Sequence, residues 1–258
     1  MNHWDYSRFK KEFYKKAGLD LDCYKDRQME RRIRQFMQRE GKEEFKLFFD
    51  HLTSNSAVLE RFLNYLTINT SEFFRDNKIF NRLKEEIIPE LMYKNSNLKI
   101  WSAGCSIGAE PYTIAIILKE LDVLKRSEII GTDVDHKALS IAEKGCYNTK
   151  QLGKIPDNFI RNYFEEHGEE YCVNTPIKKA VSFKNHNLLS DRPYTGCNLI
   201  LCRNVFIYFK QETQFFLLER FSQSLVPGGF LVIGSAEYIS NPGAYDLSKR
   251  YNTIYQKS

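Results

Sequence analysis

The pattern of apolar residues over the first seventy positions is typical of short helices. Apolar side chains recur every three or four residues, and the only glycines in this stretch, Gly18 and Gly41, stand at the ends of segments. We therefore expect a small all-helical domain over residues 1–66. A linker and a first helix of the next domain are expected over residues 67–95.

One segment of this region, residues 23–38, has two distinct helical faces. Met29, Ile33 and Phe36 fall together on an apolar face. The opposite face carries three arginines in register, Arg27, Arg31 and Arg34. From spacing alone, an ordinary solvated face is the commoner explanation, and a binding surface is the alternative.

The pattern changes from Leu98 onward. An apolar strand (LKIWSAG) runs into a turn of small residues (GCSIGAEP) and then into a helix (YTIAIILKEL). A second strand (EIIGTDVD) and helix (HKALSIAEKG) follow, and strand, helix and strand alternate again after residue 197. This alternation predicts an α/β domain with a mainly parallel sheet over residues 96–258.

Two parts of this domain break the alternation. Residues 146–186 read as a helix followed by short strands around a turn at Thr175–Pro176, which predicts an inserted antiparallel subdomain. In the tail, Asn241–Pro242–Gly243 predicts a turn, and NTIYQ predicts an edge strand that closes the sheet with a hairpin.

Composition narrows the class of protein. No run approaches the ~18 apolar residues of a membrane-spanning helix, so we expect a cytoplasmic protein without membrane insertion. A net charge of +5 over 258 residues is small for a protein devoted to nucleic acid. The six cysteines form no C-x-x-C pair and no zinc-like spacing, so they are interpreted as reduced thiols, mostly buried, with no metal site.

Candidate chemistry lies in the turns that follow the strands, where open parallel sheets bind ligands. Gly104 to Gly108 would let the backbone pass close to a ligand at a helix start, although many proteins turn tightly here without one. Asp133 ends the next strand, at about the ~20-residue distance at which an acid binds ribose hydroxyls. Asp133 or Asp135 could instead cap the following helix, and capping is the preferred interpretation for Asp135.

Glu110 indicates which nucleoside cofactor fits the loop. The loop reads G-x-x-x-G followed by Ala109-Glu110-Pro111, and it lacks the G-x-G-x-x-G of dinucleotide sites. An acid at a helix start would repel phosphate but would attract the ammonium group of a methionine moiety, which favours S-adenosylmethionine over NAD. Taken alone, a first-turn acid that complements the helix dipole is the simpler explanation.

Five segments together resemble the CheR family of chemotaxis receptor methyltransferases. They are INTSEFFRD (68–76), KIWSAGCSIGAEPYT (99–113), GTDVDHKAL (131–139), HNLL (186–189) and CRNVFIYF (202–209). The resemblance implies a Rossmann-like S-adenosylmethionine-dependent methyltransferase domain with a small antiparallel β insertion, preceded by a small all-α N-terminal domain. It also implies transfer of a methyl group to glutamate carboxylates of chemotaxis receptors, which leaves S-adenosylhomocysteine.

The resemblance carries roles for residues that match these motifs. By position, the cofactor would be bound by Asn69, Ser71, Arg75, Gly104, Glu110, Asp133, Asn187, Leu188, Arg203 and Asn204. Arg75 and Tyr208 would orient the substrate. Ser71 and Ile107 stand where threonine is usual in the family. Ala109 replaces the first glutamate of the usual G-E-E-P, which puts cofactor affinity in question.

The implied reaction needs little from the protein beyond alignment. A glutamate nucleophile, with a reference pKa of ~4.3, is already ionised at neutral pH, so no general base is required. Arg75 would hold one carboxylate oxygen, and its alternative is an ion pair with Glu72 or Asp76. For Tyr208 the alternative is a half-buried aromatic residue at the sheet edge.

The partner implied by the resemblance is the helical cytoplasmic domain of chemotaxis receptors, which would recruit the protein to receptor clusters. The arginine face of residues 23–38 would meet the acidic methylation region. The short loop at residues 166–169 favours no binding of a receptor tail peptide, and a monomer is expected. The rival hypotheses are a methyltransferase for another substrate and a non-catalytic module that binds cofactor and receptor.

Overall fold

The computed structural model describes residues 4–67, 71–153 and 155–258. The chain divides into two compact units. One contains Met1–Ile68 with Tyr208–Phe216, and the other contains Asn69–Ile207 with Leu217–Ser258. Each unit is described separately below.

The first unit is helical. Its helices are α1 (Tyr6–Ala17), the 3-10 turn Leu21–Cys23, α2 (Asp26–Arg39), α3 (Phe45–Ser54) and α4 (Ser56–Leu66). Local signals fix several of the ends: Asp5 accepts a hydrogen bond from the Arg8 amide at 2.9 Å, and Asn55 caps α4. Gly18 ends α1 in the left-handed conformation, at φ 69°.

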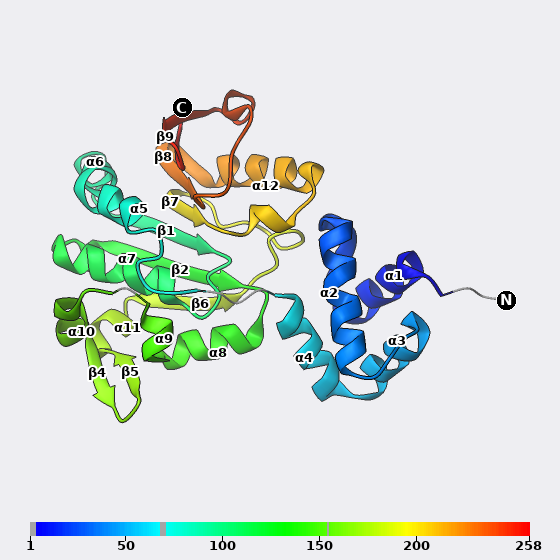
Figure 1. Cartoon of the computed structure of the whole chain (residues 1–258). Helices are drawn as coiled ribbons and strands as arrows, with labels where there is room; N and C mark the ends of the chain where they lie inside the picture. Colours follow the sequence, from blue (N-terminus) through cyan, green and yellow to red (C-terminus); the bar gives the residue numbers. More distant parts are fainter. Residues whose placement is uncertain (1–3, 68–70, 154) are drawn as a thin grey trace. The chain divides into compact units, whose positions relative to one another are not determined.

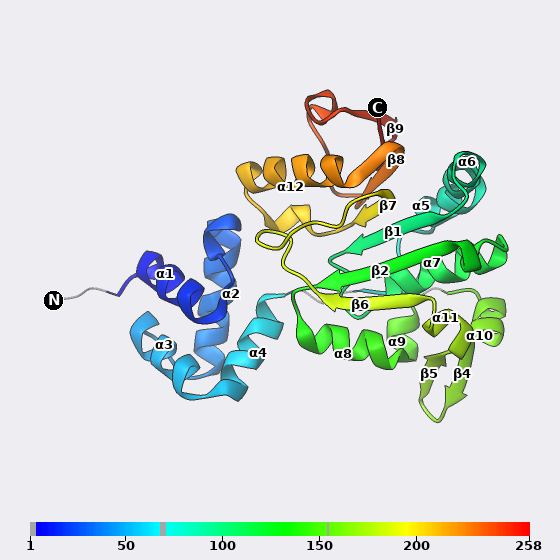
Figure 2. The same ribbon diagram turned by 180° about the vertical axis from the view of Figure 1, so that it is seen from behind.

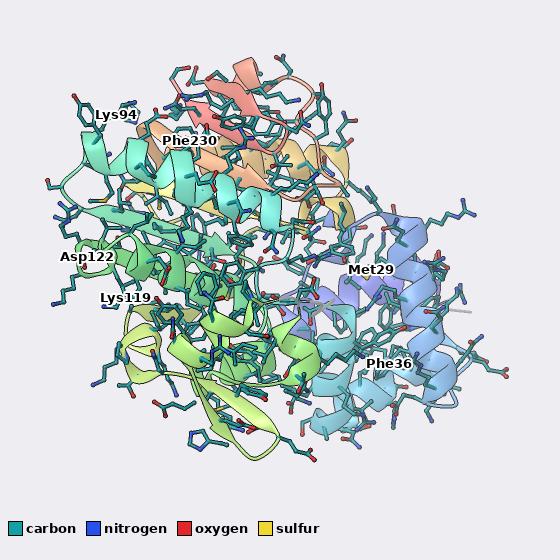
Figure 3. All side chains as sticks on the ribbon, turned by 60° about the vertical axis from the view of Figure 1, so that its left-hand side comes forward. Met29, Phe36, Lys94, Lys119, Asp122 and Phe230 are labelled. Carbon is teal, nitrogen blue, oxygen red and sulfur yellow. A yellow bond between two sulfur atoms is a disulfide. The ribbon has the colours of Figure 1, made fainter. Side chains whose placement is uncertain are left out.

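The core of the helical unit is rich in aromatic residues. Phe9, Phe13, Phe48 and Phe62 are fully buried, and their rings pack against one another in stacked and edge-on pairs. Helix α2 adds the apolar face predicted from the sequence: Met29, Ile33 and Phe36 are buried, two of them labelled in Figure 3. Arg27, Arg31 and Arg34 on the other face are exposed.

A segment from late in the sequence completes this unit. The Tyr208 carbonyl accepts a hydrogen bond from the Lys25 amide at 2.9 Å, and Lys210 forms an ion pair with Asp26 at 2.7 Å. The rings of Phe209 and Tyr24 lie 4.9 Å apart. These contacts attach residues 208–216 to the start of α2.

The second unit is built on a seven-stranded sheet with the order β6-β2-β1-β7-β8-β10-β9. The parallel strands are β1 (Leu98–Ala103), β2 (Ser127–Asp133), β6 (Val181–Asn185), β7 (Cys197–Cys202) and β8 (Leu225–Ile233). Every residue of β7 is buried, as expected for a strand covered on both faces. Figure 2 shows the arrowheads of β1, β2 and β6 at the same end of the sheet.

Helices flank this sheet in the order that the alternating pattern predicts. Figures 1 and 2, seen from opposite sides, place α7 against one face of the strands. The helices of this unit are α5 (Asn77–Arg82), continued by the π-helical turn Leu83–Ile87 into α6 (Ile88–Lys94), then α7 (Ala109–Glu120) and α8 (His136–Lys144), with α12 (Gln211–Ser224) starting in the first unit. Further 3-10 turns cover Leu124–Arg126, Phe206–Tyr208 and Pro242–Tyr245.

The predicted antiparallel insertion is present, and it ends earlier than expected. It contains β3 (Cys146–Asn148), α9 (Thr149–Leu152), α10 (Asp157–Tyr163), β4 (Phe164–His167), β5 (Glu170–Val173) and α11 (Thr175–Lys178). Figure 1 shows β4 and β5 as a hairpin beside α10. Within the predicted range 146–186, β6 instead pairs with β2 in the main sheet. Thr175–Pro176 opens a short helix capped by Asn174, because proline suits a first helical turn.

The C-terminal hairpin is also present, but its strand order differs from the prediction. It consists of β9 (Leu247–Tyr251) and β10 (Ile254–Lys257). Strand β10, predicted as an edge strand, pairs with β8 on one side and β9 on the other. Strand β9 is the edge, and five residues are too few for a hydrophobic pattern to reveal this order from sequence.

The interpretation of all six cysteines as reduced thiols is wrong for two of them. Cys146 and Cys172 lie opposite each other on β3 and β5 and form a disulfide. Sequence spacing gave no signal for this bond, because the two residues are 26 positions apart and meet only when the subdomain folds. Cys105, Cys197 and Cys202 are buried thiols, and Cys23 is partly exposed.

Candidate functional site

The loops that follow the parallel strands bring most of the predicted site residues to one edge of the sheet. Gly104 follows β1, Asp133 ends β2, Asn187 follows β6, and Arg203 and Asn204 follow β7. Because these strands are parallel neighbours, their carboxyl ends share one edge. All of these residues belong to the second unit.

The loop after β1 is held close to its neighbours by its glycines. Gly104 has φ +80°, and a Cβ atom there would lie 2.7 Å from Cγ2 of Val205 in the loop after β7. Gly108 has φ +84°, and its Cβ would lie 2.7 Å from that of Ala142. Only glycine suits both the backbone angle and the crowding. The loop is thus packed between α8 and the loop after β7.

Asp133 ties the ends of β1 and β2 together. Its Oδ2 accepts a hydrogen bond from the Ser106 amide at 2.7 Å, and its Oδ1 accepts one from the Asp135 amide at 3.0 Å. Burial raises the pKa of this carboxyl above its ordinary value. Asp135 caps α8 by accepting from the amides of Lys137 and Ala138, which confirms the preferred interpretation of that residue.

Glu110 does more than complement a helix dipole. It is the second residue of α7, and its Oε1 accepts a hydrogen bond from the Ser102 hydroxyl at 2.7 Å. Its Oε2 forms an ion pair with Nη1 of Arg203 at 3.1 Å. Since the Arg203 side chain is only 3% exposed, this pair is well shielded from water.

Arg203 joins three segments of the chain. Besides Glu110, its Nη2 donates to the Arg75 carbonyl at 2.6 Å and to Oδ2 of Asp76 at 2.7 Å. Its guanidinium lies 5.0 Å from the centroid of the Phe80 ring. The ion pair of Asp76 thus goes to Arg203, whereas the sequence had offered Asp76 as a partner of Arg75.

The loop after β6 is shaped by its own side chains. The His186 amide donates to the Asp133 carbonyl at 2.9 Å, so the loop starts beside the end of β2. Oδ1 of Asn187 accepts from the Leu189 amide at 3.0 Å, and the Asn187 amide donates to Asp191. Asn187 and Leu188 are both half-buried.

Backbone strain is concentrated at this edge. The described residues other than glycine with positive φ number six, and four belong to the loops of the site: Phe74, Asp76, Ser106 and Asn204. Such angles cost free energy and persist only where surrounding contacts enforce them. For Phe74 one such contact is its amide, which donates to Oγ1 of Thr113 on α7 at 3.2 Å.

Sequence reasoning missed Glu237, which follows β8. Its carboxylate accepts hydrogen bonds from the amides of Gly234, Asn204 and Ile207. The available signal was an acid shortly after an apolar strand (FLVIGSAE), similar to the placing of Asp133 after EIIGT. Because three residues separate Glu237 from the strand end, the pattern alone did not bring it to the site.

Three predicted site residues are not placed at this edge by the structure. Asn69 lies outside the described residues. Ser71 is half-buried in the linker. Tyr208 belongs to the helical unit, where its carbonyl accepts from Lys25.

The residues at the edge fit S-adenosylmethionine. Asp133 offers a carboxylate suited to ribose hydroxyls, and Gly104 leaves the loop without a side chain. Glu110 and Arg203 place an acid beside a base, which matches the ammonium and carboxylate groups of a methionine moiety. Nε of Arg203 is buried and lacks a partner within the described chain. Among the described residues no cluster of acidic, histidine or cysteine side chains could hold a metal ion.

Comparison with known proteins agrees with this geometry. A family model described as "CheR methyltransferase, SAM binding domain" matches residues 69–253, and "CheR methyltransferase, all-alpha domain" matches residues 4–67. A chemotaxis protein methyltransferase of Listeria innocua is 36% identical over 255 residues, which cover 98% of this chain and 97% of the relative. Chemotaxis protein methyltransferase 1 of Pseudomonas aeruginosa is 30% identical, covering 94% of this chain and 93% of the relative.

Similarity to solved structures is lower. The structure of PKMT2 from Rickettsia typhi in complex with AdoHcy has a TM-score of 0.35 and 19% identity, covering 53% of this chain and 20% of that one. The family models, by contrast, match both the helical region and the sheet region of the sequence. The chain belongs to the CheR methyltransferase family and carries its S-adenosylmethionine-binding domain.

Proposed function

We propose that this protein transfers the methyl group of S-adenosylmethionine to glutamate carboxylates of chemotaxis receptors, giving glutamate methyl esters and S-adenosylhomocysteine. The observation that carries the proposal is the Glu110–Arg203–Asp76 network at the carboxyl edge of the sheet, within a chain that matches the family over nearly its whole length. The network joins α7, the loop after β7 and the linker in one charged cluster.

The chemistry asks for alignment and removal of water. S-adenosylmethionine supplies an electrophilic methyl group, and the glutamate that receives it is ionised at neutral pH. Burial raises the pKa of the Cys105 and Cys202 thiols, so neither is a thiolate that would compete for the methyl group. Orientation of an ionised nucleophile can supply roughly 7 to 11 kcal/mol of the barrier.

Arg75 is the residue of the second unit that we assign to orientation of the substrate carboxylate, and the same role for Tyr208 of the helical unit stays a prediction. Arg75 is half-buried and stands one residue before Asp76, whose carboxylate is held by Arg203. We expect R75A to lower kcat by at least about tenfold through loss of a charge-assisted hydrogen bond. The matched control is R126A, an exposed arginine just before β2, at the opposite end of that strand from Asp133. Equal rates for both variants would contradict the role of Arg75.

The test of the whole proposal is transfer of labelled methyl from S-adenosylmethionine to membranes that contain chemotaxis receptors. Alkaline treatment should then release the label as volatile methanol, because a methyl ester hydrolyses in base and methylated nitrogen does not. Label that stays bound in base would indicate another acceptor. Cofactor binding without any receptor label would favour the non-catalytic alternative, and label on other molecules would favour a different substrate.

The exposed arginine face of α2 is the proposed contact for the receptor. Arg27 and Arg31 have no ion pair within the described chain, while Arg34 pairs with Glu30 and lies 4.7 Å from the Phe45 ring. A basic helix face suits the acidic helical region implied for the receptor. Of the three residues of the arginine face, Arg27 and Arg31 are therefore the most available to contact a partner.

We also propose how the protein assembles and which partners it binds. We take the protein to act as a monomer, recruited to receptor clusters without nucleic acid and without binding a receptor tail peptide. The edge strand β4 spans only Phe164–His167 and so offers few backbone groups to an added strand. No helix in the described ranges is long and apolar enough to cross a bilayer. Binding of a receptor tail peptide, measured by fluorescence anisotropy, would contradict the proposal that the protein binds no such peptide.

A further inference from the structure

The turn after β8 contains a buried carboxylate with an unusual set of partners. Glu237 is 8% exposed, and its Oε2 accepts hydrogen bonds from the amides of Gly234 at 2.6 Å and Asn204 at 3.1 Å. Its Oε1 accepts from the Ile207 amide at 3.3 Å. No cation pairs with it among the described residues. Its partners are therefore backbone amides of its own turn and of the loop after β7.

These bonds hold the loop after β7 at both ends. Asn204 has φ +60°, a left-handed angle that needs enforcement in a residue other than glycine. Without Glu237, the partly buried amides of Asn204 and Ile207 would lose their acceptor, and an amide shielded from water without an acceptor is costly. The carboxylate thus explains how this strained loop keeps its shape.

The side chain of Asn204 also lies against this turn. A Cβ atom on Gly234 would be 2.8 Å from the Asn204 amide nitrogen, 2.9 Å from its Nδ2 and 2.9 Å from Oε2 of Glu237. Gly234 therefore has to be glycine for Asn204 and Glu237 to approach each other. The geometry fixes both the backbone and the side chain of Asn204.

Another residue of the same turn contacts the Glu110–Arg203–Asp76 network. The Ser235 hydroxyl donates to Oδ2 of Asp76 at 3.3 Å, and that oxygen also accepts from Arg203 at 2.7 Å. Residues 234–237 thus contact the loop after β7 through Glu237 and the linker through Ser235. Both contacts end at residues proposed to border the cofactor.

Two opposing effects act on the protonation of Glu237. Burial raises the pKa of this carboxyl, although its backbone hydrogen bonds act in the opposite direction. A raised folded-state pKa means that the contribution of this group to stability is present at low pH and is lost as pH rises through that pKa. Because the same carboxylate accepts from three backbone amides, it contributes to the fold as well as to the shape of the site, and the test has to measure folding and cofactor affinity separately.

We propose that Glu237 is a positioning residue for cofactor binding, acting through the backbone and side chain of Asn204 and the loop that carries Arg203. The inference rests on the proposed function in taking Asn204 and Arg203 as cofactor contacts. Glu237 itself touches neither reactant. Its removal is expected to loosen the cofactor side of the site and leave the receptor side unchanged.

The test compares E237Q, E237D and G234A with the wild-type full chain. Binding of S-adenosylhomocysteine is measured by calorimetry, kinetics with receptor membranes give the two KM values and kcat, and circular dichroism monitors folding. E237Q and G234A should bind S-adenosylhomocysteine about tenfold more weakly or worse, as expected from loss of hydrogen bonds to a charged group. The KM for S-adenosylmethionine should rise, with the KM for receptor unchanged, and E237D should recover part of the affinity.

The matched control is E90Q. Glu90 lies on α6 in the same unit, is half-buried and pairs with Lys94 and Arg250 away from the strand ends. Its loss should change thermal stability slightly and S-adenosylhomocysteine affinity not at all. A role for Glu237 in folding alone would lower the unfolding temperature of E237Q and leave its affinity like that of E90Q.

Several outcomes would overturn the proposal. One is that E237Q and G234A both fold and bind S-adenosylhomocysteine with wild-type affinity. Another is that E237Q does not fold while G234A folds and binds with wild-type affinity. Loss of the folded state in both variants would assign the turn to global folding instead. A wild-type chain that binds S-adenosylhomocysteine but methylates no receptor would refute the proposed function alone, since the affinity comparison would still decide the role of Glu237.

Discussion

Ala109 stands where the resemblance to the family implies a glutamate, and its position gives that difference a physical meaning. It is the first residue of α7, is fully buried, and belongs to the main apolar core. The usual family glutamate would place a carboxylate at this position. The charged contacts at the helix start are instead made by Glu110, which binds Ser102 and Arg203.

Replacement of Ala109 by the family glutamate is therefore expected to destabilise this protein. A109E should lower the free energy of unfolding by about 1 to 3 kcal/mol, because a larger, charged side chain enters a filled site. Thermal and denaturant unfolding measure the change. The control is A57E in the first turn of α4, an exposed position where an acid near the helix start should be neutral or slightly stabilising. Equal stability for the two variants would show that the site at Ala109 accepts a carboxylate.

Asp133 is predicted to bind the ribose of the cofactor, and this assignment predicts a pH dependence of cofactor affinity whose sign follows from the burial of its carboxyl. Its pKa lies above the ordinary value of 3.8, chiefly because burial disfavours the charge, with Asp135 adding to the effect. At a pH between the ordinary pKa of the unfolded chain and the raised pKa of the folded protein, the folded protein holds a proton that the unfolded chain does not. Its contribution to stability is thus present at low pH and lost as pH rises through the folded pKa. If Asp133 binds the ribose hydroxyls as predicted, cofactor affinity is expected to change in the opposite direction, because those hydroxyls need a carboxylate acceptor.

Affinity for S-adenosylhomocysteine should accordingly fall as the solution is acidified, starting at a higher pH than an ordinary aspartate would give. D133N should bind about tenfold more weakly or worse at neutral pH and should lose this acid limb. Calorimetric titrations across a pH series measure both effects. D157N, at an exposed aspartate of α10, is the control and should follow the wild-type profile. A wild-type affinity that stays constant down to pH 4 would contradict the assignment.

At the scale of elements, the disulfide between β3 and β5 closes the inserted subdomain. Tyr147, directly after Cys146, is fully buried and donates from its hydroxyl to the Ile107 carbonyl in the loop after β1 at 2.7 Å. Its ring also packs on Phe73 of the linker, with centroids 5.0 Å apart. The subdomain therefore packs against two segments of the site, the loop after β1 and the linker.

Removal of the disulfide should lower stability. The bond closes a loop of 26 positions, so C146S/C172S should lose roughly 3 kcal/mol under non-reducing conditions by the chain-entropy estimate. The control is C23S, at a partly exposed free cysteine. Thiol titration of the denatured wild type checks the pairing directly: four thiols are expected without reductant and six with it. Six thiols without reductant would show that the bond does not form.

Elements were predictable where their apolar pattern was long. Strand β1 and helix α8 lie within the segments that periodicity indicated, and β2 and β7 begin one residue earlier than theirs. Helix α7 begins at Ala109, three residues earlier than predicted, inside the expected turn. Short elements were not, because four or five residues carry too little pattern to separate a turn from a helix or an edge from an interior strand. Thr175–Lys178 and β10 illustrate the two failures.

At the scale of the whole molecule, the arginine face of α2 predicts salt-sensitive encounter with the receptor. R27A/R31A/R34A should lower kcat/KM for receptor methylation at low ionic strength, with a smaller effect at high salt, because exposed charges mainly steer association. Labelled-methyl assays at several salt concentrations measure this. K11A/K15A/K16A removes the same charge from exposed positions of α1 and should have less effect. Unchanged rates for the arginine variant at low salt would refute the contact.

The sequence by itself determined the fold class, the family and most of the candidate cofactor residues, because these depend on periodicity and on motifs that lie within short segments. Asp135 as a helix cap and Asp133 at a strand end are local features of this kind. The tertiary structure alone decided which distant groups meet: Arg203 with Asp76 and Glu110, Cys146 with Cys172, and Glu237 with Asn204. The pairings at the site arise when parallel strands align their ends and loops far apart in sequence share one edge, and the disulfide arises when two antiparallel strands of the insertion pair. No local pattern records either geometry.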